Sequence, residues 1–350
     1  MTLPPYYTFY SHKVILVTGG AGAIGRNLVQ ALLKIDIEKI IVFDNLSSSA
    51  EWNIPKHHKV IFLKGDIRKT DDLLCAFQFK PEIVFHLAAF FANQRSVDFP
   101  LECEEVNGNG ILKILELCVT TGNVERFIYT NSEGGAYGSD SVSPYSENNI
   151  SYNLSTPYYI TKMSGEAYCN YYYSQYGLPV SILRLFNSYG PGEIPGPYRN
   201  VIPNFIYWAL NKISLPLTGP ETISRDFVYV ADTVEAILRA GFFIEAIATP
   251  INVSTSKKQS IYEIAHTINR IIGNNSGVHV LRSRKWDTRI SILGDNTRCK
   301  QILKFTPETD FETGLLNTIK WFIENQEKIN ETASFFPGKT SATEGKLIIH

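Results

Sequence analysis

The 350-residue sequence lacks an excess of charge of either sign: 33 Lys and Arg stand against 34 Asp and Glu, a formal net charge of −1. Such a chain has no overall field that attracts nucleic acid or an anionic membrane. It also lacks any run that approaches the roughly 18 apolar residues needed to cross a bilayer. Its first residues show no basic flank followed by an apolar core, as a secretory signal would. We therefore expect no nucleic-acid partner and no membrane partner.

Cysteine is scarce, and none of the five has the paired spacing of a zinc site or a redox motif. They are scattered at Cys75, Cys103, Cys118, Cys169 and Cys299. An odd, dispersed set is typical of reduced thiols, so we expect a cytoplasmic protein without a metal site. Internal repeats and low-complexity tracts are also missing. The length is enough for about two domains.

The first strong signal is a strand, a glycine turn and a helix near the N-terminus. Residues 14–17 form the apolar run of a buried parallel strand, and residues 26–33 continue with the period of an amphipathic helix. The glycines between them bring backbone N–H groups and a helix N-terminus up to a pyrophosphate with no Cβ in the way. The residues expected to contact a dinucleotide there are Gly19, Gly22, Ala23 and Ile24.

An acidic residue, Asp44, ends the next apolar run, 19 residues after Gly25. A carboxylate at that position suits both ribose hydroxyls of an adenosine. The polar loop that follows contains Asn45 and Ser47, which can continue along the ribose. No arginine directly follows Asp44 to receive a 2′-phosphate, so NAD is favoured over NADP as the cofactor.

Two later strands also end in residues suited to a cofactor. Residues 60–63 lead into Asp66, which could reach an adenine amino group or, alternatively, cap a helix at 71–77. Residues 83–86 end in His86, which lies in an apolar run and is interpreted as a core histidine. The residues after it are small enough for the backbone to approach the cofactor closely, and comprise Leu87, Ala88 and Ala89.

Strands alternate with helices from residue 14 to about residue 185. This alternation predicts an α/β fold, a Rossmann-type doubly wound parallel sheet with its ligand beyond the C-terminal ends of the strands. From residue 187, proline and glycine break the chain into shorter elements. We expect an NAD-binding domain at 1–185, a smaller mixed α/β substrate-binding domain at 186–332 with segments that cross back, and a loosely ordered tail at 333–350.

Tyr158 and Lys162 lie four residues apart, which places both on one face of a helix. A tyrosine needs its pKa of about 10 lowered to act as a base near neutrality, and a neighbouring ammonium group does this. The spacing alone is weak, because the segment contains many other tyrosines.

Together these features resemble the extended short-chain dehydrogenase/reductase family, and within it the nucleotide-sugar epimerases and dehydratases. The stretches that carry the resemblance are 18–25, 86–89, Asn107, Tyr158 with Lys162, 184–192 and 224–230. The resemblance implies a permanently bound NAD, with Ile67, Asn107 and Thr130 among its contacts. It also implies that Tyr158 takes the proton of a sugar hydroxyl, usually that at C4, while Lys162 lowers the tyrosine pKa and holds the nicotinamide ribose.

One position departs from the family pattern. The family has a Ser or Thr four residues before a Tyr-Gly pair, where it hydrogen-bonds the reacting oxygen, and this sequence has Glu133 there. Either the loop is one residue longer and Ser132 takes that role, or Glu133 itself faces the substrate and accepts a proton. A third interpretation places Glu133 in solvent.

The same stretch bears on the reaction type. Dehydratases of the family share an Asp-Glu pair just before that Tyr-Gly and decarboxylases a Ser-Glu pair, whereas this chain has Gly134, Gly135 and Ala136. We therefore favour an isomerase, an NAD-dependent 4-epimerase of a nucleotide sugar, UDP-linked in particular, acting through a transient 4-keto sugar and bound NADH. The alternative is a 4,6-dehydratase or a lyase like UDP-glucuronate decarboxylase. Net alcohol oxidation and a non-catalytic nucleotide sensor also stay open.

The resemblance further assigns residues to the nucleotide sugar. The positions are Arg95 and Glu133 near the sugar, Asn187 at the diphosphate or the sugar, Asn200 and Val201 at the diphosphate, the stretch from Leu215 to Leu217 at the base, and Arg225 and Arg284 at phosphates. Arg225 could instead pair with neighbouring acids, and Arg282 and Arg289 compete with Arg284. A planar guanidinium suits a diphosphate because it binds two oxygens at once. The resemblance also implies a homodimer formed through the helices at 102–121 and 156–176.

Overall fold

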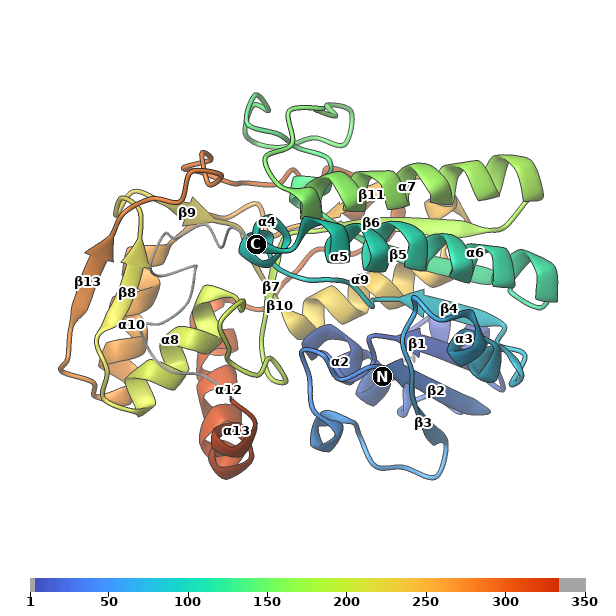
Figure 1. Ribbon diagram of the computed structural model, residues 1–350, viewed down its shortest axis with the longest axis horizontal. Helices are drawn as coiled ribbons and strands as arrows, with labels where there is room; N and C mark the ends of the chain where they lie inside the picture. The colour runs from blue at the N-terminus through green and yellow to red at the C-terminus, as the bar shows by residue number, and fades with distance from the viewer. Residues whose placement is uncertain (1–3, 334–350) are drawn as a thin grey trace.

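The computed structural model describes residues 4–333 and contains one large parallel sheet (Figure 1). Its strands are β1 (Val14–Thr18), β2 (Lys39–Asp44), β3 (Val60–Lys64), β4 (Ile83–His86), β5 (Arg126–Ser132), β6 (Val180–Leu185) and β11 (Pro250–Val253). They are hydrogen-bonded in the order β11-β6-β5-β4-β1-β2-β3. The order reverses between β1 and β4, the point where such sheets bind ligands. The predicted doubly wound fold is confirmed.

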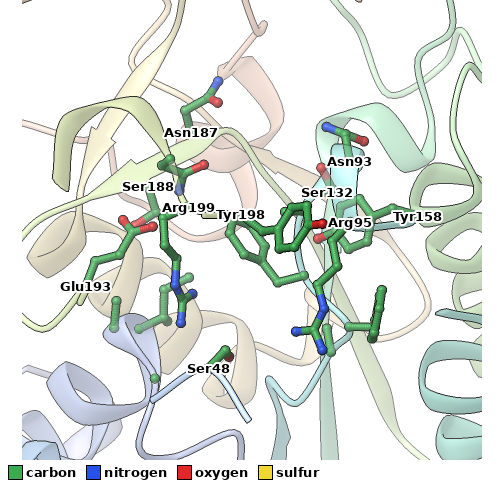
Figure 2. Close-up of a pocket in the computed structure, with 18 of the residues that line it drawn as sticks. Ser48, Asn93, Arg95, Ser132, Tyr158, Asn187, Ser188, Glu193, Tyr198 and Arg199 are labelled. Atoms are coloured by element: carbon green, nitrogen blue, oxygen red, sulfur yellow. The ribbon is translucent and has the colours of Figure 1, made fainter. Parts of the chain in front are cut away.

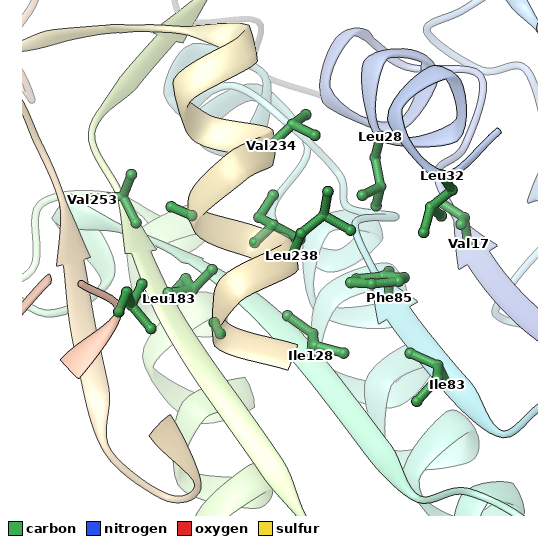
Figure 3. Packing of buried hydrophobic residues seen from close by; sticks show 14 of the residues in the cluster. Val17, Leu28, Leu32, Ile83, Phe85, Ile128, Leu183, Val234, Leu238 and Val253 are labelled. Carbon is green, nitrogen blue, oxygen red and sulfur yellow. The ribbon is translucent and has the colours of Figure 1, made fainter. Parts of the chain in front are cut away.

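Helices cover both faces of this sheet. One face carries α1 (Tyr6–Tyr10), α2 (Ala23–Leu32) and α9 (Val230–Phe242), and the other carries α3 (Thr70–Phe77), α6 (Gly110–Thr121) and α7 (Pro157–Tyr176). Val17 and Phe85 pack into the first layer (Figure 3), whereas their neighbours Leu16 and Val84 pack into the second. The strands are apolar on both sides because successive side chains enter opposite cores.

The helix predicted over 102–121 is interrupted. A short α5 (Pro100–Glu104) leads into a π-helical segment (Glu105–Asn109), and α6 follows. Such a segment adds a residue to one turn and so changes the direction in which its side chains point.

A smaller unit with its own apolar core lies beside the large sheet, on the left of Figure 1. Its helices are α8 (Val201–Leu210), α10 (Ile261–Ile272), α12 (Phe311–Glu324) and α13 (Gln326–Thr332). Its strands form the pairs β7 (Asn187–Tyr189) with β10 (Phe227–Tyr229), β8 (Leu215–Thr218) with β13 (Val278–Leu281), and β9 (Ser224–Arg225) with β12 (Gln259–Ser260). Between these elements, α9 and β11 return to the large sheet, and α11 (Thr297–Ile302) packs beside β11.

Within residues 4–333, no helix combines the length and the apolar character that crossing a membrane requires. The five cysteines are free thiols, four of them buried. Apart from residue 333, the tail expected at 333–350 lies outside the described residues.

Gly25 lies directly against the glycine turn. A Cβ there would be 2.3 Å from the carbonyl oxygen of Gly19 and 2.6 Å from the Cα of Gly20. Backbone atoms cannot yield as a flexible side chain does, so Gly25→Ala should lower the free energy of unfolding by about 1–3 kcal/mol, measured by equilibrium urea unfolding. Gly196→Ala is the matched control, because its Cβ would meet only Arg199 Cγ at 3.5 Å. Equal unfolding free energies for the two variants would contradict this expectation.

Candidate active site

A cavity of about 500 Å³ opens at the C-terminal ends of the sheet strands, between the sheet and the smaller unit (Figure 2). Most of the predicted site residues line it: Gly19, Gly22, Ala23, Ile24, Asp44, Asn45, Ser47, Ile67, Leu87, Ala88, Ala89, Arg95, Thr130, Ser132, Glu133, Tyr158, Lys162, Asn187, Asn200, Val201, Arg225 and Arg284. Four predicted residues are not among those that line it, namely Asp66, Asn107, Leu215 and Leu217.

The glycine turn forms the part of the cavity that suits a diphosphate. Gly19 has a φ of +70°, and a Cβ there would lie 2.6 Å from the amide nitrogen of Ala88, so only glycine fits between β1 and β4. Helix α2 begins at Ala23, and the N–H groups of a first helical turn have no acceptor within the helix. These free donors and the bare backbone fit the diphosphate of NAD.

Asp44 ends β2 with its carboxylate held by three donors. Oδ2 accepts a hydrogen bond from the amide of Ala21 at 3.0 Å, and Oδ1 accepts from the amide of Leu46 at 2.8 Å and the hydroxyl of Ser49 at 3.1 Å. A carboxylate fixed in this way at the cavity wall fits the ribose hydroxyls of an adenosine. Ser49 belongs to the polar loop after Asp44 that was predicted to continue along the ribose.

Asp66 is turned toward Arg68 instead of the cavity. Arg68 Nη2 donates to Asp66 Oδ2 at 2.7 Å. Burial alone would raise the pKa of Asp66, but hydrogen bonds from Arg68 and Asn45 lower it to about 2. Asp66 does not cap a helix either, because Lys69 is the N-cap of α3. Arg68 and Ile67 line the cavity in its place.

Asn107 lies in the π-helical segment and supports the cavity wall from behind. Its Oδ1 accepts from the amide of Phe90 at 2.7 Å, and its Nδ2 donates to Thr161 Oγ1 at 3.1 Å. The predicted direct contact with the cofactor is therefore replaced by a bridge between the segment after β4 and helix α7.

Tyr158, Ser132 and Lys162 come together where α7 approaches the end of β5. The side chains of Ser132 and Tyr158 both line the cavity (Figure 2). Burial raises the pKa of Tyr158 above its ordinary value, and the nearby hydroxyl of Ser132 opposes that rise. Lys162, one helical turn further, donates from Nζ to the carbonyl oxygen of Thr130 at 2.5 Å.

Burial also lowers the pKa of two other groups near the end of the sheet, Lys162 and His86. It lowers the pKa of Lys162 to about 8. It lowers the pKa of His86 to about 3, with a further contribution from the charge of Lys162. His86 is 2% exposed and its Nδ1 lies 2.8 Å from Thr18 Oγ1, so it is a neutral core histidine as predicted.

Glu133 is neither in solvent nor unpaired. Its Oε2 lies 3.1 Å from Arg289 Nη1, and both side chains are less than 10% exposed. The other terminal nitrogen of Arg289 donates to the hydroxyl of Tyr159 at 2.7 Å. Arg289 is the main residue that the sequence prediction missed: it was weighed only as a competitor of Arg284, and nothing in its spacing points to Glu133.

The two glycines after Glu133 leave no room for side chains. A Cβ at Gly134 would lie 2.0 Å from the ring of Tyr159, and a Cβ at Gly135 would lie 2.9 Å from Lys162 Cβ. The turn that follows β5 can therefore carry no functional group at these two positions.

On the substrate side, strand register decides which residues face the cavity. Leu215 and Leu217 are fully buried in the core of the smaller unit, whereas Pro216 and Thr218 line the cavity. Of the stretch from Leu215 to Leu217 that was predicted to contact the base, only Pro216 lines the cavity, because successive side chains of a strand point to opposite faces.

Both predicted phosphate-binding arginines, Arg225 and Arg284, line the cavity from the smaller unit. Arg225 Nη2 lies 3.0 Å from Asp287 Oδ1, the ion pair considered as its alternative role. Burial lowers the pKa of Arg284, whose guanidinium stacks over Trp286 at 5.6 Å.

The buried Lys162 should make stability depend on pH. Its pKa is about 8 in the folded chain, against about 10.4 in an unfolded one. Between these pH values the unfolded chain binds more protons than the folded chain, so the free energy of unfolding increases as the pH rises. Measured by urea unfolding, wild type should therefore gain stability relative to Lys162→Met from pH 8 to pH 10. A difference that stays constant over this range would contradict the burial of the ammonium group.

Known proteins with similar sequences and structures cover nearly the whole chain. A solved epimerase of Methanothermobacter thermautotrophicus is 44% identical, with a TM-score of 0.92 over 94% of this chain and 97% of that one. A UDP-glucose 4-epimerase of Mycolicibacterium smegmatis is 34% identical over 88% of this chain and 97% of the relative. A UDP-N-acetyl-alpha-D-glucosaminuronate decarboxylase of Bacillus cytotoxicus is 31% identical over 89% of this chain and 98% of the relative.

The model of the NAD dependent epimerase/dehydratase family matches residues 15–253, more than half of the chain. That segment contains the glycine turn, Asp44, Tyr158 and Lys162. The chain belongs to the NAD-dependent epimerase/dehydratase family.

Proposed function

We propose that this protein is a 4-epimerase of UDP-sugars. The observation that carries the proposal is the group formed by Ser132, Tyr158 and Lys162, next to a turn whose one carboxylate, Glu133, is paired with Arg289. Oxidation and reduction at one carbon require a proton acceptor beside the cofactor. Elimination and decarboxylation would need a further free acid or base, and the adjacent positions 134 and 135 admit no side chain.

In this proposal Tyr158 moves the proton and its neighbours set its basicity. Tyr158 takes the proton of the C4 hydroxyl, Ser132 hydrogen-bonds the same oxygen, and the ammonium group of Lys162 stabilises the phenolate. Bound NAD supplies the acceptor for the C4 hydride and later its donor. Once the 4-keto sugar has rotated in the cavity, C4 is reduced from its other face and Tyr158 gives its proton back to the C4 oxygen.

The remainder of the cavity accounts for the nucleotide. We assign Arg225, Arg284 and Asn200 to the diphosphate, because guanidinium and amide groups match its oxygens. Pro216 and Thr218 take the place of Leu215 and Leu217 beside the base. A UDP-sugar is favoured because the relatives of similar length include a UDP-glucose 4-epimerase.

The test is the product formed from UDP-glucose. Wild type should give an epimer of unchanged mass, detected by mass spectrometry and NMR. Tyr158→Phe should lower kcat by about 10²–10⁴-fold because proton transfer is lost. Tyr173→Phe is the control, since Tyr173 lies on the same helix but is 42% exposed. Unchanged turnover in Tyr158→Phe would overturn the assignment.

Glu133→Gln separates the epimerase from the lyase alternative, which the decarboxylase relative supports. If Glu133 only orients Arg289, this variant should lose less turnover than Tyr158→Phe. A loss as large as that of Tyr158→Phe, together with a wild-type product lighter by water from UDP-glucose or by carbon dioxide from UDP-glucuronate, would assign the protein to the lyases.

We also propose a homodimer formed through the outer faces of α5 and α7. Ile160 is 53% exposed on α7 and Leu101 is 81% exposed on α5; Tyr171, eleven residues after Ile160 and therefore on the same face of α7, is 49% exposed. A row of apolar side chains of this kind is typical of an interface. Light scattering should give a dimer for wild type and a monomer for Ile160→Glu. A monomeric wild type would contradict the proposal.

A further inference from the structure

The loop between β7 and α8 reaches from the smaller unit to both walls of the cavity. At one wall, Asn53 Nδ2 donates to the carbonyl oxygen of Gly192 at 2.9 Å and to that of Ala21, in the glycine turn, at 2.8 Å. At the other wall, the hydroxyl of Tyr198 donates to Asp98 Oδ2 on α4 (Asn93–Asp98) at 2.9 Å. Residues 190–200, here called the strap, therefore cross the cofactor side of the cavity.

The strap is held in one shape by its own hydrogen bonds. Asn204 on α8 bonds both the amide and the carbonyl oxygen of Gly196, each at 3.0 Å. Burial raises the pKa of Glu193, and Asn200 lies close enough to that carboxyl group to oppose the shift. These interactions hold the strap at the base that adjoins α8, which is where Arg199 also lies.

Two arginines enter the cavity from its opposite walls. Arg199 extends from the strap and Arg95 extends from α4 (Figure 2). Arg95 Nη2 lies 3.9 Å from Glu102 Oε1. Burial lowers the pKa of Arg199, the charge of Glu193 on the strap opposes that shift, and the charge of Arg95 adds to it. The two guanidinium groups therefore lie within electrostatic range of each other.

Two guanidinium groups that enter one cavity from opposite walls suit an anion between them. Asp44, the residue suited to the adenosine ribose, is close enough to act electrostatically on Arg199. The strap also reaches the glycine turn through Asn53. These observations associate Arg199 with the cofactor side of the cavity, whereas Arg225 and Arg284 lie near Asp287 and Trp286.

We propose that Arg199 and Arg95 clamp the diphosphate of NAD from opposite walls, and that the strap keeps the cofactor in place between turnovers. The cofactor is then held partly by the smaller unit and not by the sheet domain alone. The proposal rests on the NAD dependence of the family and not on which sugar is epimerised.

The test measures NAD retention, a readout that does not depend on turnover. NAD bound per chain is determined by chromatography after purification and again during extended dialysis. Arg199→Gln should lose NAD about 10- to 100-fold faster than wild type, because a charge-assisted contact is lost. Tyr198→Phe should also accelerate the loss, because it unties the strap from Asp98. Arg282→Gln is the control, since Arg282 is exposed and does not line the cavity.

Binding of UDP to each variant separates the two diphosphates that could occupy the clamp. The proposal expects the Kd for UDP to change by less than about twofold in Arg199→Gln. In binding free energy, that change is less than half of RT ln 10, the value for a tenfold change in Kd. Weaker UDP binding with unchanged NAD retention would assign Arg199 to the nucleotide sugar and overturn the proposal. So would NAD loss equal to that of Arg282→Gln. Circular dichroism and urea unfolding exclude misfolded variants from the comparison.

Discussion

The approach of helix α7 to the end of β5 is the contact on which the site depends. It is close because three residues lack side chains: besides Gly134 and Gly135, a Cβ at Gly165 would lie 2.3 Å from the hydroxyl oxygen of Tyr129. The helix can therefore rest almost on the backbone of the turn. This brings Tyr158 within hydrogen-bonding reach of Ser132 and Lys162 within reach of the Thr130 carbonyl group.

A buried ion pair between β6 and α7 holds the same helix against the sheet. Arg184 on β6 is 1% exposed and its Nη2 lies 2.6 Å from Oε1 of Glu166 on α7, while Asn131 on β5 donates to the other oxygen of Glu166 at 2.6 Å. Burial disfavours the charge on Arg184, but the bonds from Glu166 outweigh it and raise the pKa of Arg184. Because an unpaired charge would be costly at this depth, the pair restrains the rotation of α7. The glycines set the distance of the helix, and this pair sets its orientation.

The smaller unit is joined to both halves of the cavity by polar contacts. Arg289 pairs with Glu133 next to the tyrosine, and Asn53 joins the strap to the glycine turn. The smaller unit therefore contacts both the cofactor wall and the reactive end of the cavity. Glu133, the one departure from the family pattern, is part of this structural link through Arg289.

The sequence by itself determined the features that depend on near neighbours. The glycine spacing, Asp44 at a strand end, and Tyr158 with Lys162 four residues later are local patterns, because backbone geometry relates such residues directly. Only the tertiary structure decided which way Leu215 and Leu217 face, that Asn107 turns away from the cavity, and that Glu133 meets Arg289, 156 residues further along. Those outcomes depend on strand register, on one extra residue in a helical turn, and on which loops the fold brings together. Each is set by packing between segments that are distant in the sequence, and a short stretch of sequence does not specify such packing.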